Sequence, residues 1–165
     1  MRWFVIVAVV LSVISPAQPQ KDKTVSEHMA SFSQQQQNDI REAVFRYQFR
    51  HNASIQGSSA AVYCLSVENN ADPPDDFMKR FAGFKPPVHK ASDCSTDAYK
   101  GVVEKATGKR GLVFRVKSIK WISQTDAEVV GGYFEDGLSA SGNTYTVIKT
   151  QGKWKVSKAK TNWIS

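Results

Sequence analysis

The stretch GLVFRVKSIKW (residues 111–121) decides the fold of this chain. The residues that alternate in its first half are the apolar Leu112, Phe114 and Val116 and the charged Arg115 and Lys117. A period of two is typical of a strand that buries one face. The next apolar positions, Ile119 and Trp121, are out of phase by one residue, which indicates a β-bulge. We therefore expect a long, bent strand here.

Further extended segments follow this strand. Residues 127–135 carry a glycine pair at 131–132, where the missing side chains permit a second bend or the close approach of another backbone. Tyr145 heads the next strand, and a two-residue turn at 151–152 leads into a last strand that contains Trp154. These segments predict an antiparallel meander of strands.

Upstream of the meander, residues 34–51 have the periodicity of a helix. Ser33 and Gln36 have the spacing of a capping box, in which each side chain accepts from the other residue's backbone N–H. Apolar side chains then recur at intervals of three and four residues: Ile40, Ala43, Val44 and Tyr47, with Phe45 and Phe49 widening the stripe. A face this wide predicts a helix laid across a bent sheet.

Shorter elements lie between the helix and the meander. Residues 61–67 are a compact apolar run and predict a short strand. Asp72 and Pro73 favour the start of a second helix, with Asp72 as its cap and Gly83 as its end. The two prolines within residues 84–94 favour an irregular or edge-strand segment.

Together these elements predict an α+β fold. An N-terminal amphipathic helix packs on a curved antiparallel sheet of about four to five strands, and one short helix is added. The strands cluster late in the sequence, after the helices, which argues against a parallel sheet of βαβ units. Residues 33–165 are expected to form this single domain.

Residues 1–17 have the features of a secretory signal peptide: a positive start, an apolar run and small residues before a cleavage site. The apolar run is too short for a helix that spans a membrane. We expect cleavage after Ala17 and a secreted or periplasmic protein. Residues 18–32 are polar and aperiodic, which predicts a disordered arm. No later stretch is apolar over the length of a membrane helix, so no membrane span is expected in the mature chain.

The chain contains two cysteines, Cys64 and Cys94. In an oxidising compartment the default is one disulfide between them, and two reduced, buried thiols are the alternative. The three histidines and two cysteines lack the spacing of a metal site, so we expect neither a metal nor a cofactor.

Positive charge gathers in the C-terminal part of the chain. Residues 18–99 carry nine Lys and Arg against ten Asp and Glu, whereas residues 100–165 carry twelve against five. This asymmetry permits attraction to polyanions such as nucleic acid, anionic lipid or cell-wall polymers.

Three segments resemble ones that recur in short exported bacterial proteins of unknown function. They are VYCLSV (62–67), the stretch from DDF to FKPPV (75–88) and LSASGNTY (138–145). The likeness covers most of residues 40–165, implies an exported bacterial protein and transfers no catalytic residue. The order of elements is also similar to cystatin-like and NTF2-like rolls, in which a sheet curls round a helix.

These observations predict an exported, non-enzymatic binding or accessory domain. The first alternative is a small-molecule-binding or enzymatic NTF2-like roll whose pocket, between helix and sheet, is lined by Tyr47, Phe114, Trp121, Tyr133 and Tyr145. The second is polyanion binding through the lysines of the last strand, Lys153, Lys155, Lys158 and Lys160. The same lysines also suit the solvent-facing side of a half-buried strand. Partner, pathway and oligomeric state stay open.

Overall fold

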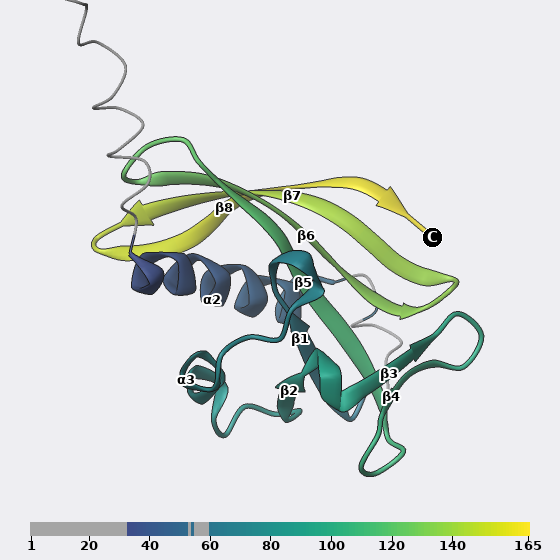
Figure 1. Cartoon of the computed structure of the whole chain (residues 1–165). Helices are drawn as coiled ribbons and strands as arrows, with labels where there is room; N and C mark the ends of the chain where they lie inside the picture. Colours follow the sequence, from purple (N-terminus) through teal and green to yellow (C-terminus); the bar gives the residue numbers. More distant parts are fainter. Residues whose placement is uncertain (1–32, 53, 55–59) are drawn as a thin grey trace, which may run out of the picture. The chain divides into compact units, whose positions relative to one another are not determined.

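The computed structural model describes residues 33–52, 54 and 60–165 (Figure 1). Residues 1–32, which include the predicted signal peptide and arm, lie outside the described residues. Within the described part, no helix has both the length and the apolar character needed to cross a membrane. The backbone is built from one long helix, short helical turns and a sheet of eight strands.

All eight strands belong to one sheet. They are β1 (Val62–Ser66), β2 (Val88–Lys90), β3 (Cys94–Asp97), β4 (Gly101–Glu104), β5 (Arg110–Trp121), β6 (Asp126–Asp136), β7 (Ser139–Thr150) and β8 (Lys153–Ile164). The main order is β2-β1-β5-β6-β7-β8, and β4 pairs with both β5 and β3. β1 runs parallel to its two neighbours, β2 and β5, whereas the pairings from β5 to β8 are antiparallel.

The predicted α+β fold, with an antiparallel sheet of about four to five strands, is wrong. The chain is largely β, with one long helix and a mixed sheet of eight strands. Four of the strands are very short, with five residues in β1, three in β2 and four each in β3 and β4. β1 joins the sheet by placing Val62 beside Gly111, far along the chain. Parallel neighbours share no tight connecting turn, so no local pattern reveals their pairing.

The long helix α2 spans Gln34–His51, and the structure confirms its predicted capping box. The backbone N–H of Gln36 donates to Ser33 Oγ at 3.2 Å, and that of Ser33 donates to Gln36 Oε1 at 3.0 Å.

Figure 1 shows α2 lying along one side of the sheet formed by β5 to β8. We call the side that α2 covers the inner face and the opposite side the outer face. The inner face holds the main core, which includes Ile40, Val44, Phe45, Phe49, Leu65 and Phe114.

Local irregularities in the sheet agree with the sequence pattern. The predicted bulge on β5 is present between Val116 and Ser118. The glycine pair on β6 allows a close backbone approach, because a Cβ added to Gly132 would lie 1.9 Å from the carbonyl oxygen of Ser141. Both residues of the turn at 151–152 have positive φ, as a type I′ hairpin requires.

The second helix is shorter than the sequence pattern predicts. α3 (Asp75–Met78) continues as the 3₁₀ turn η3 (Lys79–Phe81), and Pro74 rather than Asp72 is its N-cap. A residue that precedes proline disfavours helical φ and ψ, so the Pro73-Pro74 pair delays the helix. Asp72 Oδ1 instead accepts from the backbone N–H of Ser92 at 3.0 Å. Two further 3₁₀ turns are η2 (Glu68–Asn70) and η4 (Ala91–Asp93).

The predicted disulfide between Cys64 and Cys94 is confirmed. It joins β1 to the first residue of β3, with the two Cα atoms 6.6 Å apart. The pair belongs to a small second core on the outer face, made of Val62, Cys64, Cys94, Val102 and Val113. The disulfide therefore attaches the β3–β4 hairpin to the strand at the other side of β5.

Candidate functional site

The C-terminal half of α2 and the inner face of β6, β7 and β8 enclose a cavity of about 280 Å³, here called the helix–sheet pocket. The residues that carry its chemistry are Tyr47, Gln48, Asn52, Tyr133, Asn143 and Tyr145. Aspartate, glutamate, lysine and arginine are all missing from its lining among the described residues. The pocket is therefore polar and aromatic but carries little charge.

Aromatic rings form one wall of the helix–sheet pocket. Tyr47 stacks on His51, with ring centroids 4.2 Å apart, and meets Tyr145 edge-on at 5.8 Å. Tyr133 and Tyr145 are buried, with 6% and 3% of their surface exposed. Rings held by packing in this way lose little conformational entropy when a ligand contacts them.

Gln48 is the central polar group of the pocket and is itself buried, with 3% of its surface exposed. Its Nε2 donates to the carbonyl oxygen of Arg115 at 3.1 Å and to the hydroxyl of Tyr145 at 3.2 Å. Gly131 makes room for this amide, because a Cβ there would lie 3.1 Å from Gln48 Nε2. The amide orientation is thus set by the backbone of the bulged strand.

Two carbonyl oxygens of the pocket residues lack hydrogen-bond donors. Gln48 Oε1 and Asn52 Oδ1 are buried and have no partner among the described residues. The Asn52 amide is held by its Nδ2, which donates to the main-chain oxygen of Gln48 at 2.9 Å. A buried acceptor left without a donor costs about 1–3 kcal/mol. A ligand that supplies O–H or N–H groups here recovers this free energy.

Tyr145 can act as a hydrogen-bond donor in the pocket. Burial raises the pKa of its hydroxyl, and the hydrogen bonds with Gln48 and Asn143 oppose this rise. The phenol is consequently protonated at neutral pH. The Tyr145 hydroxyl accepts a hydrogen bond from Gln48 Nε2, and its own proton can be donated to a ligand.

The structure brings three of the five predicted pocket residues together. Tyr47, Tyr133 and Tyr145 line the helix–sheet pocket, whereas Phe114 and Trp121 do not. Phe114 is completely buried in the aromatic core between α2 and β1. Trp121, at the far end of β5, packs edge-on against Trp154.

Sequence reasoning missed the polar members of the pocket, Gln48 and Asn52 above all. Gln48 follows Val44 by four residues and so continues the apolar stripe of α2. A glutamine at a core position of a helix was the available signal, because a buried amide needs hydrogen-bond partners.

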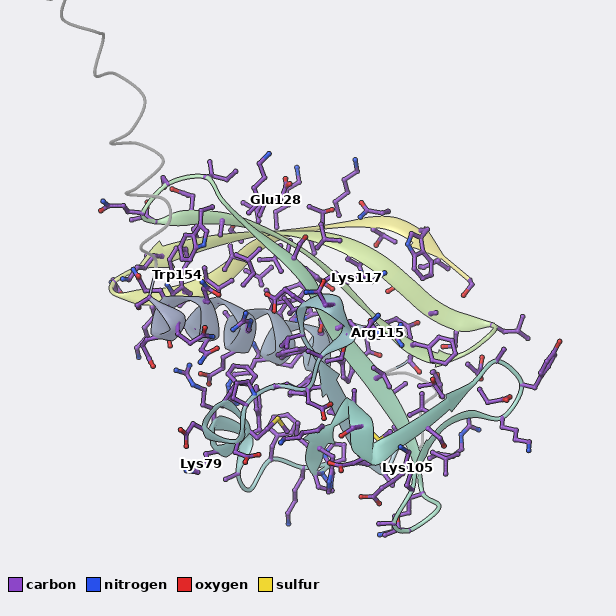
Figure 2. The ribbon with its side chains drawn as sticks, in the orientation of Figure 1. Lys79, Lys105, Arg115, Lys117, Glu128 and Trp154 are labelled. Atoms are coloured by element: carbon purple, nitrogen blue, oxygen red, sulfur yellow. A yellow bond between two sulfur atoms is a disulfide. The ribbon has the colours of Figure 1, made fainter. Side chains whose placement is uncertain are left out.

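The four predicted lysines of β8 are all exposed, but they divide between two surfaces. Lys155, Lys158 and Lys160 lie opposite Ile148, Thr146 and Thr144 of β7, whose neighbours Tyr145 and Val147 face the core. These three lysines therefore point outward. Figure 2 shows Glu128 on the same outer face and Trp154 on the side of α2.

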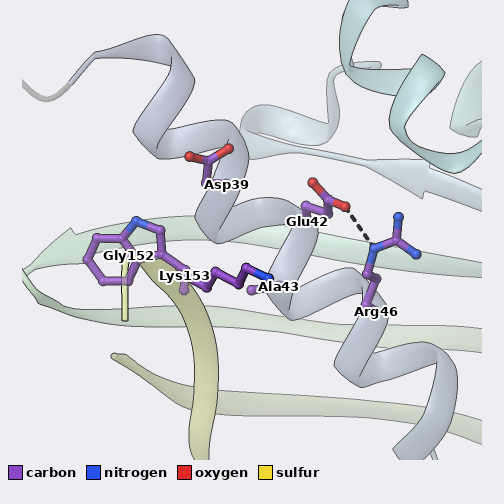
Figure 3. A pocket seen from close by; sticks show the side chains of 7 residues that line it. Asp39, Glu42, Ala43, Arg46, Gly152 and Lys153 are labelled. Carbon is purple, nitrogen blue, oxygen red and sulfur yellow. Dashed lines mark hydrogen bonds and ion pairs between the residues drawn. The ribbon is translucent and has the colours of Figure 1, made fainter. Parts of the chain in front are cut away.

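Lys153 instead lines a charged groove of about 340 Å³ beside α2, together with Asp39, Glu42, Arg46 and Trp154 (Figure 3). Three of its four charged residues, Asp39, Glu42 and Arg46, form ion pairs. Arg46 binds Glu42 at 2.8 Å, and Arg80 binds both Asp39 and Glu42 at 2.8 Å. The groove is larger than the helix–sheet pocket, and its ionic groups other than Lys153 already have partners.

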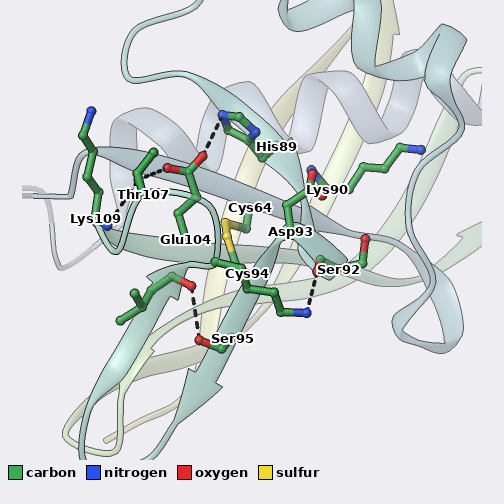
Figure 4. Close-up of a disulfide and its surroundings, with 12 residues drawn as sticks. Cys64, His89, Lys90, Ser92, Asp93, Cys94, Ser95, Glu104, Thr107 and Lys109 are labelled. Carbon is green, nitrogen blue, oxygen red and sulfur yellow. Dashed lines mark hydrogen bonds and ion pairs between the residues drawn. A yellow bond between two sulfur atoms is a disulfide. The ribbon is translucent and has the colours of Figure 1, made fainter.

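Besides the helix–sheet pocket and the charged groove, a cluster of polar side chains surrounds the disulfide (Figure 4). His89 Nε2 lies 3.4 Å from Glu104 Oε1, and Thr107 also donates to the Glu104 carboxylate. The strand register brings His89 and Glu104 together. His89 is paired with Cys64 of β1, Glu104 is paired with Cys94 of β3, and the disulfide joins these two cysteines. The cluster is held together by internal contacts and shapes the surface above the disulfide.

Comparison with known proteins gives no match. No protein-family model matches the sequence, and neither curated proteins nor solved structures yield a significant relative. The resemblance to exported bacterial proteins and to cystatin-like or NTF2-like rolls therefore stays a prediction. Function has to be inferred from the chain's own side chains.

Proposed function

We propose that this protein is a non-enzymatic binding domain that holds one small, uncharged, hydroxyl-rich molecule in the helix–sheet pocket. The observation that carries the proposal is the pair of buried, donor-free oxygens, Gln48 Oε1 and Asn52 Oδ1, in residues that line an aromatic cavity. Polar groups that converge beside aromatic rings in a concave site are a usual mark of a ligand pocket.

Size and charge narrow the ligand. A volume of about 280 Å³ is at the lower limit for ligand pockets and suits a single ring or a short polyol. The lining offers no fixed countercharge, so a charged ligand would lose hydration without an ionic partner. A sugar-like ring supplies hydroxyl donors to the two oxygens and presents its C–H faces to the tyrosines.

The pocket offers binding groups rather than a catalytic pair. Ser141 is the buried serine on its lining, and its hydroxyl accepts from the Asn143 amide at 2.8 Å. His51 also lines the pocket, but the contact that its Nδ1 makes is with the main-chain oxygen of Tyr47, at 3.0 Å. A serine nucleophile needs a neighbouring base to take its proton, and an amide does not act as one. This contact favours a binding role over hydrolysis.

The test compares two tyrosine variants by ligand-observed NMR with a panel of neutral monosaccharides and polyols and of charged sugar acids and amines. Tyr145→Phe removes a pocket hydroxyl, whereas Tyr63→Phe makes the same change in the aromatic cluster of Phe49 and Phe114, away from the pocket. We expect a neutral compound to bind the unmodified protein and Tyr63→Phe alike. Tyr145→Phe should bind it about tenfold more weakly, the loss of about one hydrogen bond.

Two outcomes would overturn this proposal. One is that no neutral compound binds while charged ones do. The other is that both variants lose affinity equally, which would place the effect in folding rather than in the pocket. Thermal unfolding of each variant separates these cases.

A specific observation favours a second candidate function, the binding of polyanions at the outer face. Lys155, Lys158 and Lys160 are exposed there and form no ion pair with the described residues. Trp163, on the same strand, is 49% exposed and lies across Gly142. Unpaired cations beside an open aromatic ring are the features that polyanion-binding surfaces share.

A further inference from the structure

The outer face carries a second cavity that is separate from the helix–sheet pocket. It has a volume of about 250 Å³ and lies where β1 and β5 pair in parallel, bordered also by η2, η4 and β3. We call it the outer pocket and define it by Ser66, Asn70, Thr96 and Arg115. Carboxylate side chains are missing from its lining among the described residues.

Arg115 is the charged group of the outer pocket. The side chain is half-buried, and its guanidinium makes neither an ion pair nor a hydrogen bond with the part of the chain that the structure describes. The guanidinium lies over the Phe134 ring, with Cζ 5.9 Å from the ring centroid. Four other arginines each bind a carboxylate: Arg41, Arg46, Arg80 and Arg110. Burial lowers the pKa of Arg115, because desolvation disfavours the charged form.

Ser66 gives the second, independent observation. Its side chain is buried, with 3% of its surface exposed, and its hydroxyl has no hydrogen-bond partner among the described residues. In the parallel pairing of β1 with β5, Ser66 lies directly opposite Arg115. Ser66, with its buried hydroxyl, and Arg115 thus occupy neighbouring positions on the outer face, and both residues line one cavity.

Both groups lack the same kind of partner. A guanidinium presents parallel N–H donors that match two oxygens of a carboxylate, sulfate or phosphate, and a serine hydroxyl can donate to another oxygen. We propose that the outer pocket binds a small oxyanion, with Arg115 as its charge partner and Ser66 as a hydroxyl donor. Asn70 and Thr96 stand on the same lining and offer further polar contacts.

This site does not depend on the neutral ligand of the helix–sheet pocket. The two cavities lie on opposite faces of the sheet and share no lining residue. The test therefore uses simple anions. Inorganic phosphate, sulfate and acetate are titrated into the purified protein at constant ionic strength set with chloride, and backbone amide shifts near Arg115 are followed by NMR.

Matched variants make the assignment sharp. Arg115→Gln removes the unpaired charge, and Arg110→Gln removes one charge from the same strand where it already faces Glu135 and Asp136 at 3.6 and 3.8 Å. We expect Arg115→Gln to weaken binding at least tenfold and Arg110→Gln to leave it unchanged. Ser66→Ala should weaken binding severalfold while the free protein stays as stable as before, because the hydroxyl has no partner to lose.

The three probes identify the source of the oxyanion. Preference for phosphate or sulfate indicates a tetrahedral anion, and preference for acetate indicates a carboxylate. The proposal is overturned if none of the three shifts resonances near Arg115. It is also overturned if the two arginine variants lose affinity equally, since only net charge would then matter.

Discussion

The inner and outer faces of the same sheet differ in what they bury and in what they leave unpaired. On the inner face, α2 covers a continuous apolar core, and the buried polar atoms without a partner among the described residues are Gln48 Oε1, Asn52 Oδ1 and Trp154 Nε1. The outer face carries the small apolar cluster around the disulfide, the exposed lysines of β8, and Arg115, which has no ion pair among the described residues. One alternating pattern along β5 thus serves two opposite environments, and the two ligands that we propose, one neutral and one anionic, follow from this difference.

The comparison is sharpest for two phenylalanines on opposite faces of the sheet. Phe114 is completely buried on the inner face, and Phe134 is half-buried on the outer face. Phe114→Ala should lower the free energy of unfolding by about 3–5 kcal/mol, because it removes a fully packed ring. Phe134→Ala should lower the free energy of unfolding by roughly half as much, because part of the Phe134 ring already faces solvent. Urea denaturation of both variants measures the difference, and equal losses would remove the distinction between the faces.

Removing the disulfide tests how much the covalent link on the outer face contributes to the stability of the fold. The bonded cysteines are 30 residues apart in sequence. Replacing both by alanine should lower the free energy of unfolding by about 3–4 kcal/mol, because the unfolded chain regains loop entropy. The unfolding midpoint of the unmodified protein should fall in reductant, while that of the double variant should not respond. Neutral-ligand binding should survive, since the helix–sheet pocket contains neither cysteine.

The smallest effect on stability is expected from the lysines of the outer face. Reversing three charges together, Lys155→Glu, Lys158→Glu and Lys160→Glu, should change the free energy of unfolding by less than about 1 kcal/mol, because these side chains are exposed and form no ion pair with the residues that the structure describes. Elution of the protein from heparin should move to much lower salt.

A matched control for this experiment also reverses three exposed charges, in the turns on either side of β4: Lys100→Glu, Lys105→Glu and Lys109→Glu. The control should keep most of the heparin retention. Equal losses in both variants would show that net charge, and not the outer face of β8, attracts the polyanion.

Elements with local signals were predicted correctly from the sequence. The bounds of α2, its capping box, the bulge on β5 and the turn at 151–152 each depend on residues a few positions apart. The cap of α3 was misplaced because Asp72 satisfies a distant backbone N–H of Ser92 rather than its own helix. The edge position of the segment after Pro87 was anticipated, but its parallel partner was not.

By itself, the sequence determined the long helix at residues 34–51, the bulged strand β5 and the turn at 151–152, because periodicity and turn chemistry act over a few residues. Only the tertiary structure decided that β1 joins β5 in parallel, that Gln48 reaches Tyr145 while Phe114 and Trp121 stay outside the pocket, and that Ser66 meets Arg115. Those arrangements depend on surfaces far apart in the chain packing together, and no local pattern records which two surfaces will meet.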